Sequence, residues 1–487
     1  MKTTQLTLIT ATVLLGAGCP KGGGAPLAAA PPTIGAPADF SPPVAEQSAG
    51  PGGSAVWLVA KPELPLVSVR LVIPGGSSTD PAAQPGLASM ADAALLLGAG
   101  DRDAAAFAEA MALHAVNLDV STGKRGTVLA VDCKADQLDF ALGLMADVVL
   151  RPRFDSAAVE ILRDERKAEL TQAADEPRLV AALVADQVWF GAEDPRGRRT
   201  EGTVPVVSAL RGEELRASWT ARALPTGATF VVVGAADPAV VGAKLGAHFG
   251  AWAGAPSAAA PSWSPPPAVV GGPRLTLVDN PGASQTVLRV VLPGWPQADA
   301  DQAAGELGVI ALGGTFTSRL NRLLREEKGY TYGARAAADS SPGSGRVIIS
   351  TNVFLDKTGP ALSDLLGEVK RFGAGIDAAE LEKAKGSVRT DQIEVLGARS
   401  SIADTLVGLV LTGRGPGALR EELSARLAVT EAAADASAAR PRLDAAQIVV
   451  VGDLSKVEAE VVKAVTEAAG AAPTLTRLDA AGQPVQR

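Results

Sequence analysis

Apolar and polar residues follow regular patterns in two long stretches of the chain, and these patterns predict its secondary structure. Alternation in "VWLVAKPELPLVSVRLVIPGG" and "VNLDVSTGKRGTVLAVDCKA" predicts paired strands, whereas helical spacing in "ADQLDFALGLMADVVL" and "SAAVEILRDERKAELTQAA" predicts long helices. The run "FVVVGA" predicts a closing strand. Strands and helices do not alternate strictly, so we expect an α+β fold with a mostly antiparallel sheet covered by helices on one face.

The same pattern occurs twice. The second stretch opens with "LTLVDNPGASQTVLRVVLPGW", in which Pro293 matches Pro74 of the first stretch at an offset of 219 residues. Near the two ends, Gly452 of "AQIVVVGDL" matches Gly234 of "ATFVVVGAAD" at an offset of 218 residues. An offset held over most of each half indicates a duplicated domain, so we expect two homologous α+β domains.

Two stretches with hardly any large apolar residues divide the chain. Residues 20–54 are rich in Gly, Pro, Ala and Ser, which predicts a disordered tether. "GAPSAAAPSWSPPPAVVGGP", from Gly254, is a second segment of this kind and predicts a Pro/Ala-rich linker between the halves. The expected divisions are a signal peptide at 1–19, the tether at 20–54, an N-terminal domain at 55–253, the linker at 254–272 and a C-terminal domain at 273–487.

The first residues are typical of a bacterial export signal. Lys2 precedes an apolar run from Leu6 to Ala17, which is too short to span a bilayer as a mature helix. "LLGAGC" resembles a lipobox, which makes Cys19 the expected site of lipidation; an ordinary secretory signal cleaved nearby is the alternative. The lipobox predicts a lipid-anchored protein of the bacterial cell envelope, on the periplasmic face of the outer or inner membrane. Lys21 leaves the choice of membrane open.

Composition narrows the class of partner. The formal net charge is -8 and there is no block of Lys and Arg, which argues against nucleic acid as a ligand. Cys133 is the one cysteine besides Cys19, so a disulfide framework is excluded, and its place in an alternating strand predicts a small core residue.

Two further stretches carry a family resemblance. With the duplicated halves, "DPRGRRTEGTVPVVSALRGEELRASW" and "GGTFTSRLNRLLREEKGYTYGA" resemble the pitrilysin/insulinase family of zinc peptidases, above all its processing-peptidase branch. The resemblance covers about residues 55–455, and the Arg-Glu-Glu-Lys-Gly-Tyr-x-Tyr-Gly segment is its most specific part. In that branch, two-domain chains of this size pair around a chamber.

The zinc motif of the family is degenerate in this chain. Active members carry H-x-x-E-H, in which two imidazoles one turn apart hold zinc and the glutamate acts as general base; a later glutamate is the third ligand. In "GLASMADA" the two histidine positions hold Ser89 and Ala93, and the base position holds Asp92. Glu169 falls at the third-ligand position. The resemblance therefore implies no zinc in this chain and a chain that is inactive as a peptidase on its own.

The remaining candidates at this site are weak. The chain contains two histidines, His114 and His248, and neither falls at a ligand position, so we expect both at the surface. Ser89 has no His or Lys placed to activate it as a nucleophile. Asp92, without a metal to serve, is expected to hydrogen-bond Ser89 or to be exposed on the chamber wall. The charged run "RDERKAE" around Glu169 is interpreted as a solvated helix face.

The second half holds the candidate substrate-binding pair. Arg325 and Tyr332 lie seven residues apart, across a helix end, a turn at Gly329 and the start of a strand. The resemblance implies that this pair holds the substrate backbone beside a partner's zinc, with the phenol as donor to the oxyanion. The structural alternative is that Arg325 pairs with a glutamate of its helix and Tyr332 packs on the sheet.

The sequence thus predicts a non-catalytic, substrate-binding subunit of a zinc metallopeptidase that acts on unfolded peptides. Its partner would be a homologous chain with an intact H-x-x-E-H motif and the zinc. Family members also bind substrate as a strand added to a sheet edge. "SGRVIISTNVF" (Ser344 to Phe354) is the candidate edge strand, with an interior strand as the alternative. The competing hypothesis is a stand-alone scaffold or peptide-binding protein with no proteolytic role, as in the core subunits of respiratory complexes.

Overall fold

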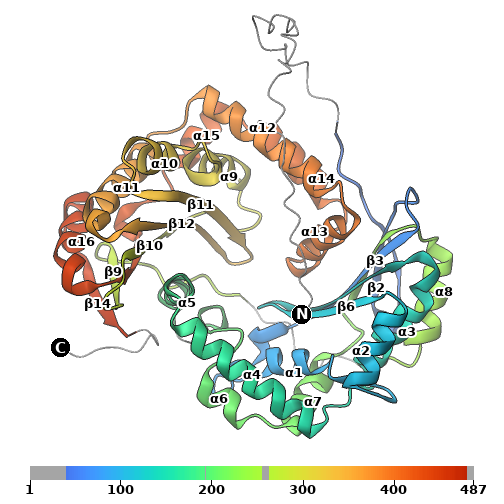
Figure 1. The fold of residues 1–487 in the computed structure, drawn as a ribbon. Coiled ribbons are helices and arrows are strands. Elements are labelled where there is room, and N and C mark those ends of the chain that lie inside the picture. Colours follow the sequence, from blue (N-terminus) through green and yellow to red (C-terminus); the bar gives the residue numbers. More distant parts are fainter. Residues whose placement is uncertain (1–39, 192, 255–262, 480–487) are drawn as a thin grey trace, which may run out of the picture. The chain divides into compact units, whose positions relative to one another are not determined.

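The computed structural model describes residues 40–191, 193–254 and 263–479 (Figure 1). The export signal, Cys19 and most of the predicted tether lie outside these residues. Within them, the strands form two six-stranded sheets and a two-stranded ribbon of β4 (Gly98–Ala99) and β5 (Arg102–Asp103). None of the helices in the described part of the chain is long and apolar enough to cross a membrane.

The first sheet has the strand order β1-β2-β8-β3-β7-β6. The strands β2 and β8 pair in parallel and the other neighbours pair antiparallel. Its central strand β3 is buried along most of its length, as expected of a strand that is covered on both faces. In sheet order the strands are β1 (Glu46–Ala49), β2 (Ala55–Ala60), β8 (Thr229–Gly234), β3 (Leu66–Pro74), β7 (Gly126–Lys134) and β6 (Asn117–Thr122).

The second sheet has the order β11-β12-β10-β13-β9-β14, and its first five strands correspond to β6-β7-β3-β8-β2 of the first sheet. The pairs β13–β9 and β9–β14 are parallel, and the others are antiparallel. In sheet order the strands are β11 (Thr331–Ser341), β12 (Ser344–Phe354), β10 (Gln285–Pro293), β13 (Gln447–Gly452), β9 (Arg274–Asp279) and β14 (Thr474–Leu478).

Helices cover both sheets. Those of the first half are α1 (Leu87–Ala94), α2 (Ala104–Leu113), α3 (Leu138–Leu150), α4 (Ser156–Ala174), α5 (Pro177–Phe190), α6 (Val204–Ala209), α7 (Gly212–Arg222) and α8 (Pro238–Phe249). Those of the second half are α9 (Gln302–Val309), α10 (Arg319–Asn321), α11 (Thr358–Phe372), α12 (Ala378–Val395), α13 (Arg399–Leu411), α14 (Ala418–Leu427), α15 (Glu431–Ala438) and α16 (Leu454–Ala469).

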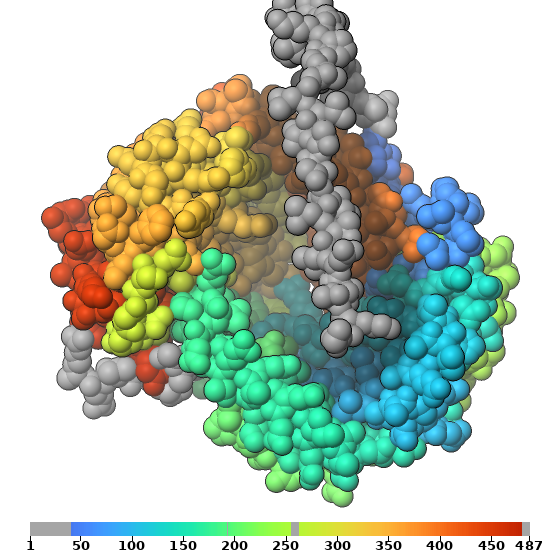
Figure 2. Space-filling model, viewed as in Figure 1, coloured from blue at the N-terminus to red at the C-terminus, as the bar shows by residue number. Residues whose placement is uncertain are grey.

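One helix of each half packs on the sheet of the other half. The helix α5 packs on β10 and β13 of the second sheet, where Val180 and Val184 join a buried cluster with Val287 and Val449. In return, α13 packs on β3 and β8 of the first sheet. Figure 2 shows the green surface of α5 against the yellow-green surface at the start of the second half. This packing buries apolar side chains from both halves, so residues of α5 lie against one face of the second sheet.

The predicted fold class is confirmed: five strands follow the same order in both α+β halves, with Pro74 and Pro293 at the ends of the matching strands β3 and β10. The outer strands do not correspond, because β1 pairs antiparallel with β2 and β14 pairs in parallel with β9. Two details differ. The strand β1 lies in the predicted tether, because an exposed edge strand can be held by backbone pairing with β2 without large apolar side chains. The candidate edge strand Ser344–Phe354 is the interior strand β12, and the edge is β11.

Candidate functional site

The helix α1 carries the degenerate zinc motif, and Asp80 holds its first turn. The helix follows Gly86, whose φ of +96° favours glycine. The Asp80 carboxylate accepts hydrogen bonds from the backbone N–H groups of Gly86 (2.9 Å) and Ala88 (2.8 Å). These contacts satisfy two donors at the helix start that have no partner inside the helix. Sequence reasoning missed Asp80, which lies six residues before Gly86, the residue that precedes the first turn of α1.

Burial raises the pKa of Asp80 to about 6, against the opposing effect of its two backbone hydrogen bonds. The folded chain therefore keeps a proton that the unfolded chain releases near pH 4. The contribution of Asp80 to stability is fully present below about pH 4 and is lost as the pH rises through about 6.

The difference in unfolding free energy between the wild type and Asp80→Asn should depend on pH. We expect this difference, wild type minus variant, to fall by about 2–3 kcal/mol between pH 4 and pH 7. Urea denaturation of both proteins across this range measures the difference. Asp119→Asn, at an exposed position of β6, is the control. A difference that stays flat or rises with pH would contradict the assignment.

Asp92 is neither exposed nor bonded to Ser89, so both expectations for it are wrong. Its side chain is 1% exposed, and Oδ1 lies 2.6 Å from Nη2 of Arg222 on α7. Oδ2 accepts hydrogen bonds from the hydroxyls of Thr122 (2.7 Å) and Thr127 (2.5 Å). Both oxygens are thus engaged by side chains from other elements, and the carboxylate is not available as a general base.

Arg166 of α4 contacts the side chains at two of the three former ligand positions. Its Nη1 donates to Ser89 Oγ at 2.9 Å, and its Nε lies 3.0 Å from Glu169 Oε2. Ala93 offers only a methyl group. One hydroxyl, one methyl and one carboxylate already paired with a cation do not fit zinc, which prefers imidazole, thiolate and carboxylate ligands. The charged run predicted to be a solvated face therefore contains Arg166, whose side chain is only 13% exposed.

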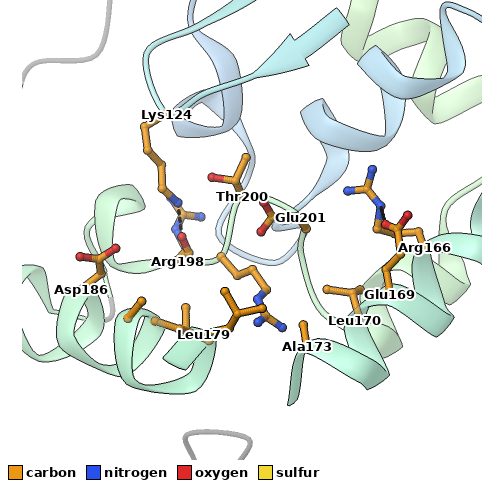
Figure 3. Close-up of a pocket in the computed structure, with 13 residues that line it drawn as sticks. Lys124, Arg166, Glu169, Leu170, Ala173, Leu179, Asp186, Arg198, Thr200 and Glu201 are labelled. Atoms are coloured by element: carbon orange, nitrogen blue, oxygen red, sulfur yellow. Dashed lines mark hydrogen bonds and ion pairs between the residues drawn. The ribbon is translucent and has the colours of Figure 1, made fainter. Parts of the chain in front are cut away.

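A pocket of about 380 Å³ lies beside these residues (Figure 3). Arg166 and Glu169 lie at one side of it, and Lys124, Arg198 and Asp186 lie at the other, above the apolar side chains of α4 and α5. Lys124 donates to the backbone carbonyl of Arg198, and burial lowers the pKa of its ammonium. The pocket is thus lined by charged side chains of both signs together with apolar ones.

The histidines and the free cysteine lie apart from this site. His114 stacks on Phe140 of α3 with ring centroids 3.6 Å apart. His248 of α8 has its Nε2 3.3 Å from Oδ1 of Asp139, which also lies on α3. Cys133 is buried in the core, and burial raises the pKa of its thiol to about 11, as expected of an inert core residue. Among the described residues, no group of three or more His, Cys, Asp or Glu side chains is placed to hold a metal ion.

Arg325 and Tyr332 lie on either side of a turn in the second half. Arg325 is in the π-helical segment η6 (Arg322–Glu327), and Tyr332 is the second residue of the edge strand β11. Gly329 between them has a φ of +63°, which supports the predicted glycine turn. The Arg325 guanidinium lies over the Phe316 ring at 3.9 Å, and Tyr332 is 80% exposed.

Asn321 fixes this helix to the edge strand, a role that sequence reasoning missed. Its Nδ2 donates to the carbonyl of Ala334 at 2.9 Å, and its Oδ1 accepts from the N–H of Ala334 at the same distance. A buried amide that completes a strand in this way sets the strand's register against the helix. The only hint in the sequence is an amide inside an otherwise charged and apolar helix.

The sequence and the fold both match one family of peptidases. The family profile "Insulinase (Peptidase family M16)" matches residues 55–193, and "Peptidase M16 inactive domain" matches residues 210–388. The chain belongs to peptidase family M16, the insulinase family, and lacks its zinc motif.

Similar proteins include both sequence relatives and solved structures. An uncharacterized zinc protease of Mycobacterium leprae is 30% identical over 304 residues, which cover 61% of this chain and 66% of the relative. The matched stretch is thus just under two thirds of that relative's length. The peptidase M16 inactive domain of Pseudomonas fluorescens has a TM-score of 0.76 at 23% identity, covering 84% of this chain and 98% of that one.

A third match is the first half of the periplasmic protease PqqL of Escherichia coli. Its TM-score is 0.72 at 14% identity, and it covers 88% of this chain and 96% of that chain. At such identities, the likeness to the two solved structures shows a common fold.

Proposed function

We propose that this chain is the non-catalytic, substrate-binding subunit of an M16 zinc metallopeptidase that acts on unfolded peptides in the bacterial cell envelope. A homologous chain with an intact H-x-x-E-H motif is its partner and carries the zinc. Cys19 anchors the subunit to the membrane by a lipid, as the lipobox-like "LLGAGC" indicates. The subunit supplies Arg325 and Tyr332 to hold the substrate backbone.

The observation that carries this proposal is the contrast between the two halves. In the first half, Asp92 is paired with Arg222, and Ser89 and Glu169 at two former ligand positions contact Arg166. In the second half, Tyr332 keeps an exposed phenol at the start of the edge strand β11. A chain that has lost metal ligands while keeping an Arg/Tyr pair at the family's spacing is suited to complete another chain's site.

The physical chemistry of the pair supports the same role. Arg325 has no carboxylate among its described contacts and lies instead over the ring of Phe316, which is 62% exposed. A guanidinium held by an aromatic face retains N–H donors for a peptide carbonyl. An exposed edge strand offers backbone groups to an extended peptide of any sequence. Together these features favour a peptide as the ligand.

The test is reconstitution with a purified homologous chain that carries H-x-x-E-H. Adding this chain should raise the partner's cleavage of a fluorogenic peptide, and Arg325→Ala should reduce that gain by about 10-fold to 100-fold, as expected for loss of a charge-assisted hydrogen bond. Arg322→Ala is the matched control, because Arg322 lies on the same segment with a side chain that is 64% exposed. Metal analysis should find zinc in the partner and no stoichiometric zinc in this chain.

Equal cleavage with and without this chain would overturn the subunit role and favour a stand-alone scaffold or peptide-binding protein. Equal loss in Arg325→Ala and Arg322→Ala would show that the arginine acts through general charge, and would remove the specific role of Arg325.

A further inference from the structure

A second pocket, of about 310 Å³, lies between the start of α5 and the face of the second sheet. Tyr332 is one of its lining residues. The charged residues that line it are Arg178 from α5 and Arg289 from β10, and among the described residues no carboxylate lines it. Its other polar lining side chains carry hydroxyl or amide groups: Gln285, Thr331, Ser350, Thr351 and Asn352. Such a lining favours an anionic ligand.

In the part of the chain that the structure describes, no carboxylate forms an ion pair with Arg289. Its Nε is buried and has no hydrogen-bond partner among the described residues, and burial lowers the pKa of its guanidinium. The carboxylate whose charge acts on it is Asp186, but Asp186 Oδ1 is 2.7 Å from Nη1 of Arg346. Arg289 is half-buried, and a partly desolvated cation whose nearby carboxylate is already paired is stabilised by an incoming carboxylate.

Two further arginines add to the positive charge of this face. Arg335 on β11 and Arg289 on β10 both stand opposite Ser350 of β12, so the three side chains share one face of the sheet. With the Asn352 amide turned so that its oxygen faces the guanidinium, Arg178 donates to that oxygen, with Nε at 2.6 Å and Nη2 at 3.0 Å. This contact fixes the Arg178 side chain without neutralising its charge.

The edge strand beside the pocket determines what kind of anion can reach it. Thr331, Tyr332 and Gly333, the first residues of β11, line the pocket. A peptide added along β11 would place alternate side chains on the face that carries Arg289 and Arg335. A carboxylate on such a peptide can then meet the guanidinium groups in the fork geometry that arginine favours.

We propose that this pocket binds a carboxylate of a peptide held beside Tyr332: the side chain of Asp or Glu, or the terminal carboxylate. The subunit then selects acidic peptides. This inference rests on the proposed function for the peptide nature of the ligand, but its test needs no partner and no cleavage.

The experiment measures binding of labelled peptides to the isolated chain by fluorescence anisotropy. A peptide with a central Glu should bind about tenfold or more tightly than its Gln counterpart, and Arg178→Gln and Arg289→Gln should each remove most of that preference. Arg178 is exposed, so its variant tests the pocket without disturbing the core. Arg442→Gln, at a side chain that is 63% exposed and outside the pocket, is the control and should change nothing.

Each peptide is also measured with an amidated C-terminus. Loss of affinity on amidation alone assigns the site to the terminal carboxylate, and loss on the Glu→Gln change alone assigns it to a side chain; both results support a carboxylate site. Equal binding of all four peptides, or a preference that survives both arginine variants, overturns it. The proposed function fails separately, if a zinc-bearing partner cleaves peptides equally well without this chain.

Discussion

Replacing Arg222 with leucine is expected to lower the free energy of unfolding by about 3–5 kcal/mol, the range for removing one partner of a buried ion pair. The side chains of Arg222 and Asp92 are 7% and 1% exposed, and their nearest N and O atoms are 2.6 Å apart. Without the guanidinium, Asp92 would keep two threonine hydroxyls as donors but would lose its counter-ion in the core. Urea denaturation followed by circular dichroism measures the change.

A double-mutant cycle separates the ion pair from the packing of the arginine stem. Asp92→Asn alone should also destabilise the fold, and adding it to Arg222→Leu should cost less than the sum of the two single changes, since the uncompensated charge is then removed. Lys463→Ala, which breaks an exposed pair with Glu467, is the control and should cost less than about 1 kcal/mol. Additive effects of the two core variants would contradict a coupled pair.

The duplicated architecture could be predicted from the sequence because its signal is repeated over many residues. Pro74 and Pro293 end matching strands, and the apolar runs before Gly234 and Gly452 form the strands β8 and β13. The loss of the metal ligands could also be read directly, because the zinc motif is local and needs two imidazoles at fixed spacing.

The contacts of Asp92 could not be predicted, because they come from elements distant in the sequence. Arg222 lies 130 residues after Asp92, and Thr122 and Thr127 lie 30 and 35 residues after it. Reasoning within the helix offered only Ser89 as a partner, whereas Ser89 faces Arg166. Helical periodicity tells which residues share a face, but not which charge on another element meets them.

The edge of the second sheet was mistaken for a related reason. Residues Ser344–Phe354 alternate between buried and less buried positions, as a half-covered edge strand would, yet β11 and β10 pair on either side of them. Alternation reports that one face is buried and does not report how many neighbours a strand has. For the same reason β1 could not be predicted from alternation: its four residues are all exposed, and backbone pairing with β2 holds them.

Tyr332→Phe is expected to lower the kcat of the reconstituted peptidase by about 10²-fold to 10³-fold while leaving KM nearly unchanged. On the proposed function, the phenol donates to the oxyanion that forms from the scissile carbonyl, a contact that strengthens in the transition state. The ring itself, edge-on to Phe354 with centroids 5.9 Å apart, is retained by phenylalanine. Steady-state kinetics on a peptide substrate, at a fixed ratio of the two chains, separate kcat from KM.

The chain supplies its own control in Tyr330, its one other tyrosine. Tyr330→Phe removes a phenol hydroxyl two residues before Tyr332. We expect this variant to keep kcat within about twofold, because a hydroxyl that takes no part in the reaction makes no transition-state contact. Since Tyr332 is 80% exposed, its variant should also keep the melting temperature of the wild type, which separates a chemical role from a structural one. A fall in kcat in both variants would contradict the assignment, because only one of the two hydroxyls can donate to the oxyanion. A rise in KM alone for Tyr332→Phe would also contradict it, because loss of an oxyanion donor lowers kcat.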